Sequence, residues 1–436
     1  MPRSASAPDG AWWVAQWLAM LGVLALPVLS LSVHRGANTA YFILLLAAAL
    51  GAVAVAWRAR APGATALMPF WRDNLGLALA MTAPLLAVLI SQAWLADFNG
   101  RPYDGRSRFL LALPIAWWLY QVPRQRLQAW AWATALGAVL ATWVMWQAIP
   151  PHDTRPEPGF ATAITFGNLT LLLGLFALLS LPWRLTRSWW ETGLKVVAGL
   201  VGIYGSFLSQ SRGGWLALPV IMGVLILVVR ISWRWKLAAV VLTLAGVGTT
   251  YLASPLVQQR VDLAVAELHD YRQGQNLESS IGMRMQFWRA SWDMFRQNPL
   301  SGVGSQHINA EYRQRVEAGS MAPAAATYNH SHNEVLWFMA SWGLPGLLAL
   351  LAVYLVPFVT FVRAARAADD QRAVAGRMGV ALVTGYAVFG LTEAMFAITM
   401  NVAFYAGTVA ILLALARPAG PAGGRPNTAS SSQGAA

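Results

Sequence analysis

Long apolar stretches separated by short polar ones make up most of this chain. A helix needs about 20 apolar residues to cross the hydrocarbon core of a bilayer, and most of the stretches are near that length. About twelve are expected to form spans, at residues 11–31, 40–57, 75–96, 109–120, 129–149, 163–181, 193–208, 215–229, 237–253, 334–361, 378–395 and 399–416. The pattern predicts an all-α polytopic membrane protein, with 109–120 as its shortest span.

One long polar segment, residues 254–333, interrupts this pattern and contains seven arginines but no lysine. Two amphipathic helices are expected within it, at 255–274 and 281–297, where serines can cap the second helix and Asn298-Pro299 ends it. The chain then divides into four parts. They are nine spans (1–253), the mostly helical loop (254–333), three spans (334–417) and a tail rich in Gly, Pro, Ser and Ala that is expected to be disordered (418–436).

Composition supports the assignment to a membrane. Hydrophobic residues make up 57% of the 436 residues and charged residues 11%, and the mean hydropathy is +0.49, which is too apolar for an ordinary soluble domain. A net charge of +13 would suggest nucleic acid as the partner of a soluble protein. Here topology and lipid head groups account for it, so membrane lipids are expected partners and nucleic acid is not.

The distribution of basic residues predicts the orientation in the membrane. With the N-terminus inside, 18 of the 31 Lys and Arg residues fall on the cytoplasmic side and six in the short loops opposite. Both termini are therefore expected to be cytoplasmic and the long loop external. The first apolar run leads directly into a second and is expected to be a retained helix. The absence of cysteine excludes disulfides, thiolate metal sites and a cysteine nucleophile.

Arg284 is a candidate for binding an anion. On a helical wheel it falls on the apolar face with Met283 and Phe287, whereas Gln286 and Arg289 fall on the opposite face. An unpaired guanidinium buried there would cost several kcal/mol, so Arg284 needs a partner. Three possibilities remain open: an anionic ligand, water reached by snorkelling, or a protein carboxylate such as that of Glu393.

Arg212 is a second candidate, in the sequence Ser-Arg-Gly-Gly at 211–214 between two predicted spans. Its planar fork of donors suits a diphosphate better than the point charge of lysine does. It can equally anchor a helix at the membrane interface. Gly302 and Gly304 permit a tight turn and a close backbone approach, but the strand and the third glycine of a nucleotide-binding fingerprint are missing.

His332 is the candidate for proton transfer, because it directly precedes the span at 334–361 and its neighbour is Asn333. A neutral imidazole is the natural proton acceptor near neutral pH. His330 raises the question of a metal, but two histidines without a third ligand predict none. Glu393, near the outer end of its span, is either functional, the partner of an arginine, or a helix cap.

The order and spacing of these motifs resemble the O-antigen ligase and O-antigen polymerase superfamily. The matching motifs are Ser-Arg-Gly-Gly at 211–214, Arg284 ahead of Asn-Pro-Leu-Ser-Gly-Val-Gly at 298–304, His-Asn-Glu-Val-Leu at 332–336 and Trp-Gly-Leu-Pro-Gly at 342–346. The twelve predicted spans and the single long outer loop agree with this family as well. The resemblance implies a GT-C-like membrane glycosyltransferase.

The resemblance also implies a reaction. An O-antigen ligase of the bacterial inner membrane takes a glycan from polyprenyl (undecaprenyl) diphosphate and passes it to lipid A-core at the periplasmic face, with no cofactor expected. By position, His332 would be the catalytic base, and Arg212 and Arg284 would bind the diphosphate. His330 is an addition to the family's His-Asn pair, and the match of Asn333 favours His332. Supporting roles are open to His330, Asn333, Arg289 and Glu393.

Two other functions remain open. A polymerase or a protein O-oligosaccharyltransferase of the same superfamily would differ in its acceptor, which these motifs do not identify. A polyprenyl-lipid transporter or flippase would place charged residues along the spans at the middle of the bilayer. The polar residues of this chain instead gather at one membrane face, which favours a transferase.

Overall fold

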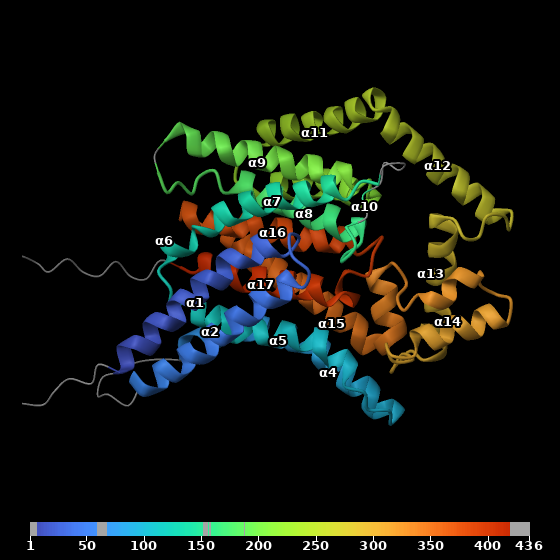
Figure 1. Ribbon diagram of the computed structural model, residues 1–436, viewed down its shortest axis with the longest axis horizontal. Helices are drawn as coiled ribbons and strands as arrows, with labels where there is room; N and C mark the ends of the chain where they lie inside the picture. Colours follow the sequence, from blue (N-terminus) through green and yellow to red (C-terminus); the bar gives the residue numbers. More distant parts are fainter. Residues whose placement is uncertain (1–6, 59–67, 151–155, 157, 187, 419–436) are drawn as a thin grey trace, which may run out of the picture.

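The computed structural model describes residues 7–58, 68–150, 156, 158–186 and 188–418, and its described part is helical throughout. Long helices form a bundle, and a smaller group of helices lies at one end of it, on the right in Figure 1. The expectation of disorder for 418–436 falls almost entirely outside the described residues.

Each of the twelve predicted spans overlaps a helix of the bundle, but the helix within the span predicted at 378–395 ends at Phe389, so Glu393 lies after it. These helices are α1 (Ala7–Leu29), α2 (Gly36–Arg58), α4 (Leu75–Leu95), α5 (Arg101–Leu119), α7 (Trp130–Gln147), α8 (Ala163–Leu179), α9 (Trp189–Leu208), α10 (Arg212–Val228), α11 (Trp233–Ala253), α15 (Glu334–Ala365), α16 (Asp370–Phe389) and α17 (Thr399–Leu415). Short helices α3 (Met68–Asp73), α6 (Arg124–Leu127) and η2 (Met395–Ala397) connect them.

Length and composition alone qualify six of the described helical stretches to cross a membrane. They are Gly10–Leu29, Gly36–Trp57, Leu75–Leu95, Arg124–Gln147, Trp233–Ala253 and Glu334–Ala365. Three further apolar helices are shorter, at Ala163–Leu179, Gly213–Val228 and Thr399–Leu415. Because α5, α9 and α16 meet neither description, the count of twelve spans stays a prediction, as does the GT-C class.

The helix behind the shortest predicted span is longer than expected. α5 begins at Arg101, with Pro102 in its first turn, where the missing N–H of proline costs nothing. Arg108 then pairs with Asp104 one turn earlier, at 3.3 Å, which supports a helix in this polar stretch. The predicted span at 109–120 did not include residues 101–108, because it was based on the apolar residues alone.

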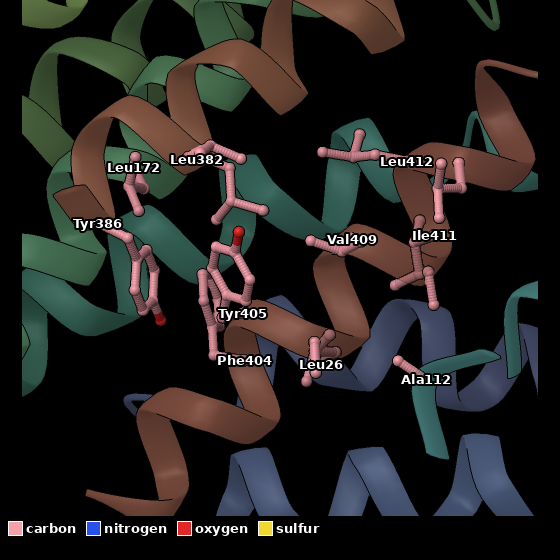
Figure 2. Packing of buried hydrophobic residues seen from close by; sticks show 14 of the residues in the cluster. Leu26, Ala112, Leu172, Leu382, Tyr386, Phe404, Tyr405, Val409, Ile411 and Leu412 are labelled. Atoms are coloured by element: carbon pink, nitrogen blue, oxygen red, sulfur yellow. The ribbon is translucent and has the colours of Figure 1, made fainter. Parts of the chain in front are cut away.

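The core of the bundle is centred on α17, whose side chains are almost all buried. A helix that is hydrophobic all round must be surrounded by other elements. Figure 2 shows Phe404, Tyr405 and Val409 of α17 among Leu26 of α1 and Tyr386 of α16. The buried hydroxyl of Tyr405 donates a hydrogen bond to the carbonyl of residue 353 (2.8 Å), so this polar group is satisfied inside the core.

The turn that contains Gly302 and Gly304 packs against a kink in α15. Helical geometry breaks at Trp342 and Gly343, and the backbone N–H groups of Val303 and Gly304 donate to carbonyls of this kink at 2.8 and 3.0 Å. Gly302 has φ +62°, and a Cβ there would lie 2.4 Å from the backbone of α15. The close backbone approach predicted from these glycines is therefore an approach to a membrane-spanning helix.

The long loop folds into α12 (Pro255–Arg272), α13 (Ser280–Gln297), α14 (Ile308–Glu317) and η1 (Pro323–Thr327). Residues of α13, α14 and the η1 segment, with Ala340 of α15, form a hydrophobic cluster around Phe287, Met294 and Tyr312. As predicted, a serine caps α13, because Ser279 Oγ accepts a hydrogen bond from the N–H of residue 282 (3.1 Å). The prediction that Gln286 is exposed was wrong: its side chain is 7% exposed.

Hydrogen bonds explain the burial of Gln286. Its Nε2 donates to the carbonyl of Leu277 (2.7 Å), and its Oε1 accepts from the N–H of Ala322 (2.7 Å). A buried amide with both ends satisfied avoids the cost that an unpaired one would carry. Gln286 thus joins α13 to the segment before η1.

Candidate active site

His332 lies in the turn between η1 and α15, at the end of the bundle that carries the loop helices. Its φ of +50° is in the left-handed region, which costs a non-glycine residue about 1–3 kcal/mol and is concentrated at functional sites. Asn333 holds the turn in place. Its Oδ1 accepts from the N–H of Leu336 (3.1 Å), and its Nδ2 donates to the carbonyl of Leu391 (3.2 Å).

The carboxylate of Glu393 contacts both histidines of the His-x-His sequence. Its Oε1 lies 3.0 Å from Nε2 of His330, and its Oε2 lies 3.1 Å from Nδ1 of His332. Glu393 is therefore the partner of two imidazoles, and its functional role stays a prediction. Burial opposes ionisation, but the hydrogen bonds and charges of the histidines outweigh it, so the pKa of Glu393 lies well below its usual value.

These contacts decide which ring nitrogens carry protons. An ionised carboxylate can only accept, so Nδ1 of His332 donates to Glu393, and Nε2 is the nitrogen that carries the lone pair whenever the ring is neutral. His330 is different, because its Nδ1 also faces an oxygen, Oδ1 of Asn329 at 2.8 Å. Both contacts of His330 are hydrogen bonds only when its ring carries two protons. His332 is therefore the histidine whose geometry suits a base.

Aromatic side chains pack around the ring of His332. Ring centroids of Phe287 and Tyr328 lie 5.8 and 5.4 Å from it, and that of His330 lies 4.6 Å away. Phe287 belongs to α13, so the loop helices contact the histidine directly. The side chain of His332 is still 17% exposed, which leaves part of the ring accessible to a ligand.

A pocket of about 380 Å³ lies between α12, α13 and the start of α10, within the size range of ligand sites. The lining residues with polar side chains include Gln210, Ser211, Arg260, Glu267, Arg284 and Thr392. Nη1 of Arg284 donates to Oγ of Ser280 (2.6 Å). Thr392 directly precedes Glu393, and Arg284 lies three residues before Phe287, so the pocket lining includes sequence neighbours of two residues that contact His332; neither histidine lines the pocket itself.

The Ser-Arg-Gly-Gly motif begins α10 beside this pocket. The side chain of Arg212 lies outside the described part of the structure, so its predicted role remains untested. Ser211 and Gly213 line the pocket, and a Cβ on Gly213 would lie 2.5 Å from Oγ1 of Thr392. The motif therefore packs against the segment that carries Glu393, and only glycine fits that contact without displacement.

The structure places five of the seven predicted site residues in this site or in the pocket; the side chain of Arg212 is not described, and Arg289 lies elsewhere. His330, His332, Asn333 and Glu393 form one connected group, and Arg284 lines the adjoining pocket. Arg289 is exposed on α13 and does not line the pocket. Among the described residues, no contact with the pocket or the histidines supports the suggested role for Arg289.

Two residues of α12 in the pocket wall were missed from the sequence. Arg260 donates to Oε1 of Gln210, and Glu267 is 7% exposed. Both line the pocket together with Leu263 and Leu268. Arg260 and Glu267 are seven residues apart, or two helical turns, on the apolar face. A helical wheel of this segment would have shown them.

The prediction that His330 and His332 have no third metal-ligating residue beside them was wrong. The nitrogen and oxygen ligand atoms of His330, His332 and Glu393 all lie within 4.8 Å of one another. The sequence showed only the two histidines, since Glu393 follows them by about 60 residues. In the structure, the carboxylate of Glu393 contacts both rings directly, at 3.0 and 3.1 Å.

The pKa of Glu393 predicts a pH-dependent contribution to stability. Because the folded state lowers this pKa from 4.5, the carboxylate stabilises the fold above that value, and the contribution is lost as pH falls below it. Glu393→Gln should lower the free energy of unfolding by about 1–3 kcal/mol at neutral pH. The difference from wild type should shrink between about pH 5 and pH 3.

Thermal unfolding of both proteins in one detergent, measured at each pH, checks this expectation. Glu317→Gln is a suitable control, because it removes an exposed carboxylate of α14. A difference between Glu393→Gln and wild type that stays constant with pH would contradict the assigned charge state.

Comparison with known proteins gives two findings. Residues 197–351 match the family model described as O-antigen ligase. An uncharacterized protein of Haemophilus influenzae is 25% identical over 270 residues, which cover 61% of this chain and 66% of that relative, just under two thirds of its length. Residues 197–351, which match the family model, contain the Ser-Arg-Gly-Gly motif, the loop helices and His332. Over residues 197–351, this chain is therefore similar to the O-antigen ligase family.

Proposed function

We propose that this protein is an O-antigen ligase. It transfers a glycan from polyprenyl (undecaprenyl) diphosphate to lipid A-core at the periplasmic face of the bacterial inner membrane. The observation that carries the proposal is the position of His332, held by Glu393 beside a pocket lined by Arg284 and Arg260. The match of residues 197–351 to the family model supports this proposal, because that family acts in general on polyprenyl-linked glycans and lipid acceptors.

His332 is the general base in this proposal. Glu393 accepts a hydrogen bond from Nδ1–H, so Nε2 is free to take a proton from the acceptor hydroxyl. The buried carboxylate then stabilises the imidazolium that forms. Partial exposure of the ring lets a sugar hydroxyl approach, whereas Phe287 and Tyr328 keep the ring in one orientation.

The arginines bind the diphosphate. Arg284 and Arg260 line the same pocket from α13 and α12, and we assign Arg212 to the same task because its motif begins α10 there. Guanidinium groups form paired hydrogen bonds with phosphate oxygens. They also stabilise the negative charge that grows on the leaving group in the transition state.

The proposed reaction proceeds in one displacement. The acceptor oxygen attacks the anomeric carbon while its proton moves to Nε2 of His332. The bond between the anomeric carbon and the diphosphate oxygen breaks, and its electron pair leaves with the polyprenyl diphosphate. Attack opposite to the leaving group inverts the anomeric configuration, which product NMR can measure.

Glycan transfer by the purified protein tests the proposed function. Protein in lipid nanodiscs would receive a polyprenyl-diphosphate-linked glycan together with lipid A-core, an acceptor protein or a second lipid-linked glycan. We expect product on lipid A-core, with inverted configuration at the new bond. A longer glycan on the polyprenyl carrier would instead identify a polymerase, and glycosylated protein an oligosaccharyltransferase. Retained configuration would rule out the single displacement.

A further inference from the structure

A second pocket lies at the opposite end of α15 from the histidines, and glycan transfer does not account for it. Its volume is about 830 Å³, and parts of α3, α4, α5, α15, α16 and α17 border it. The part of α15 that lines it begins at Leu355, 21 residues after Glu334. At 1.5 Å per residue this is roughly 30 Å, about the thickness of a bilayer core.

The lining of this pocket is divided into an apolar and a basic part. The apolar residues include Leu77, Trp117, Leu355, Val356, Val359 and Leu413. Arg363 and Arg372 contribute two guanidinium groups, and Asp73 is the one acidic side chain among the described lining residues. From Leu355 to Arg363 the wall of α15 changes from apolar to basic over about 12 Å.

The two arginines of the pocket have no protein partner among the described residues, and the buried Nε of Arg377 on α16 has none either. Arg363 is exposed, and Nε of Arg372 is buried. Within the part of the chain that the structure describes, neither guanidinium has a hydrogen bond or an ion pair. A buried donor without an acceptor costs about 1–3 kcal/mol, so an acceptor from outside the protein is expected there.

Neighbouring arginines show what a satisfied site looks like at this end of the bundle. Arg124 pairs with Asp369 at 2.6 Å. Arg417 donates to the carbonyl of Val122 at 3.0 Å. The segment after α17, residues 419–436, contains no Asp or Glu, so its side chains offer no carboxylate to Arg363 or Arg372.

We propose that this basic pocket holds an anionic phospholipid, with its phosphate between Arg363 and Arg372 and the first part of its acyl chains along the apolar wall. A phosphate diester carries the charge and the oxygen acceptors that guanidinium groups bind. Basic pockets between membrane helices are sites where lipid head groups bind. A soluble anion would leave the apolar half of the pocket unfilled. The lipid would come from the leaflet opposite the histidine site.

Native mass spectrometry of the full chain in detergent can measure this binding. We expect phosphatidylglycerol to bind more tightly than phosphatidylcholine with the same acyl chains. The double variant Arg363→Gln/Arg372→Gln should bind phosphatidylglycerol roughly 30-fold more weakly, because each basic residue near an anionic lipid contributes about a factor of five. Thermal unfolding with and without each lipid gives a second, independent readout.

The control variant is Arg230→Gln/Arg234→Gln, which removes the same charge from two exposed positions, one between α10 and α11 and one in the first turn of α11. It should keep the preference for phosphatidylglycerol. Equal binding of both lipids, or equal losses in the two double variants, would overturn the proposal. Equal affinity for glycerol phosphate without acyl chains would make this a site for soluble anions instead. The single variant Arg363→Gln, at an exposed position, decides the matter if the double variant fails to fold.

Discussion

Replacement of His332 with alanine is expected to lower the rate of glycan transfer about 10²- to 10⁴-fold, because general-base assistance contributes on this scale. The loss should fall on kcat, since the imidazole acts on the acceptor proton in the transition state. Donor binding should change little, because the arginines of the adjoining pocket remain. The measurement is initial rate against donor concentration at saturating acceptor, with purified protein in nanodiscs.

His307→Ala is the matched control for this variant. His307 lies at the start of α14 and contacts Asp97 through Nε2 at 3.1 Å, and its side chain is 46% exposed. The control also removes an imidazole of the long loop that contacts a carboxylate, but this carboxylate is Asp97 and not Glu393. Activity at the wild-type level in His332→Ala would remove the proposed base. Equal losses in both variants would indicate damage to the loop.

Replacement of Arg284 with alanine is expected to raise KM for the polyprenyl-diphosphate donor about 10- to 100-fold, which corresponds to one or two lost charge-assisted hydrogen bonds. kcat should fall as well, because charge grows on the diphosphate as it leaves. Arg284→Lys should recover only part of the loss, since lysine keeps the charge but not the planar fork. Donor titrations with the three proteins separate these effects.

Arg296→Ala is the control for Arg284, because Arg296 is exposed on the same helix. It removes one positive charge from α13 without touching the pocket. A normal donor KM in Arg284→Ala would exclude this residue from the diphosphate site. An equal rise in both variants would show a general effect of loop charge on the approach of an anionic donor.

The positions of the helices were predictable because a bilayer imposes a simple pattern on sequence. Each span must be apolar over a nearly fixed length, and polar residues mark its ends. The hydropathy pattern did not predict the start of α5, because Asp104 and Arg108 lie within this helix. Hydropathy detects what contacts lipid or core, and it does not register a polar helical turn that continues a span.

The site was predictable in its parts but not in its connections. The His-x-His sequence and Glu393 each stood out, but nothing local shows that 61 residues of chain return the carboxylate to the imidazoles. Gln286 shows the same limit on a smaller scale. Its polarity predicted exposure, whereas partners at Leu277 and Ala322, distant from it in sequence, permit its burial. Tertiary hydrogen bonds decide such cases.

The turn at 302–304 meets the kink in α15 through the main chain, by the N–H groups of Val303 and Gly304. Amide groups are the same whatever side chains accompany them. A substitution at Val303 therefore leaves these hydrogen bonds intact, whereas any residue larger than glycine at position 302 would meet the backbone of α15.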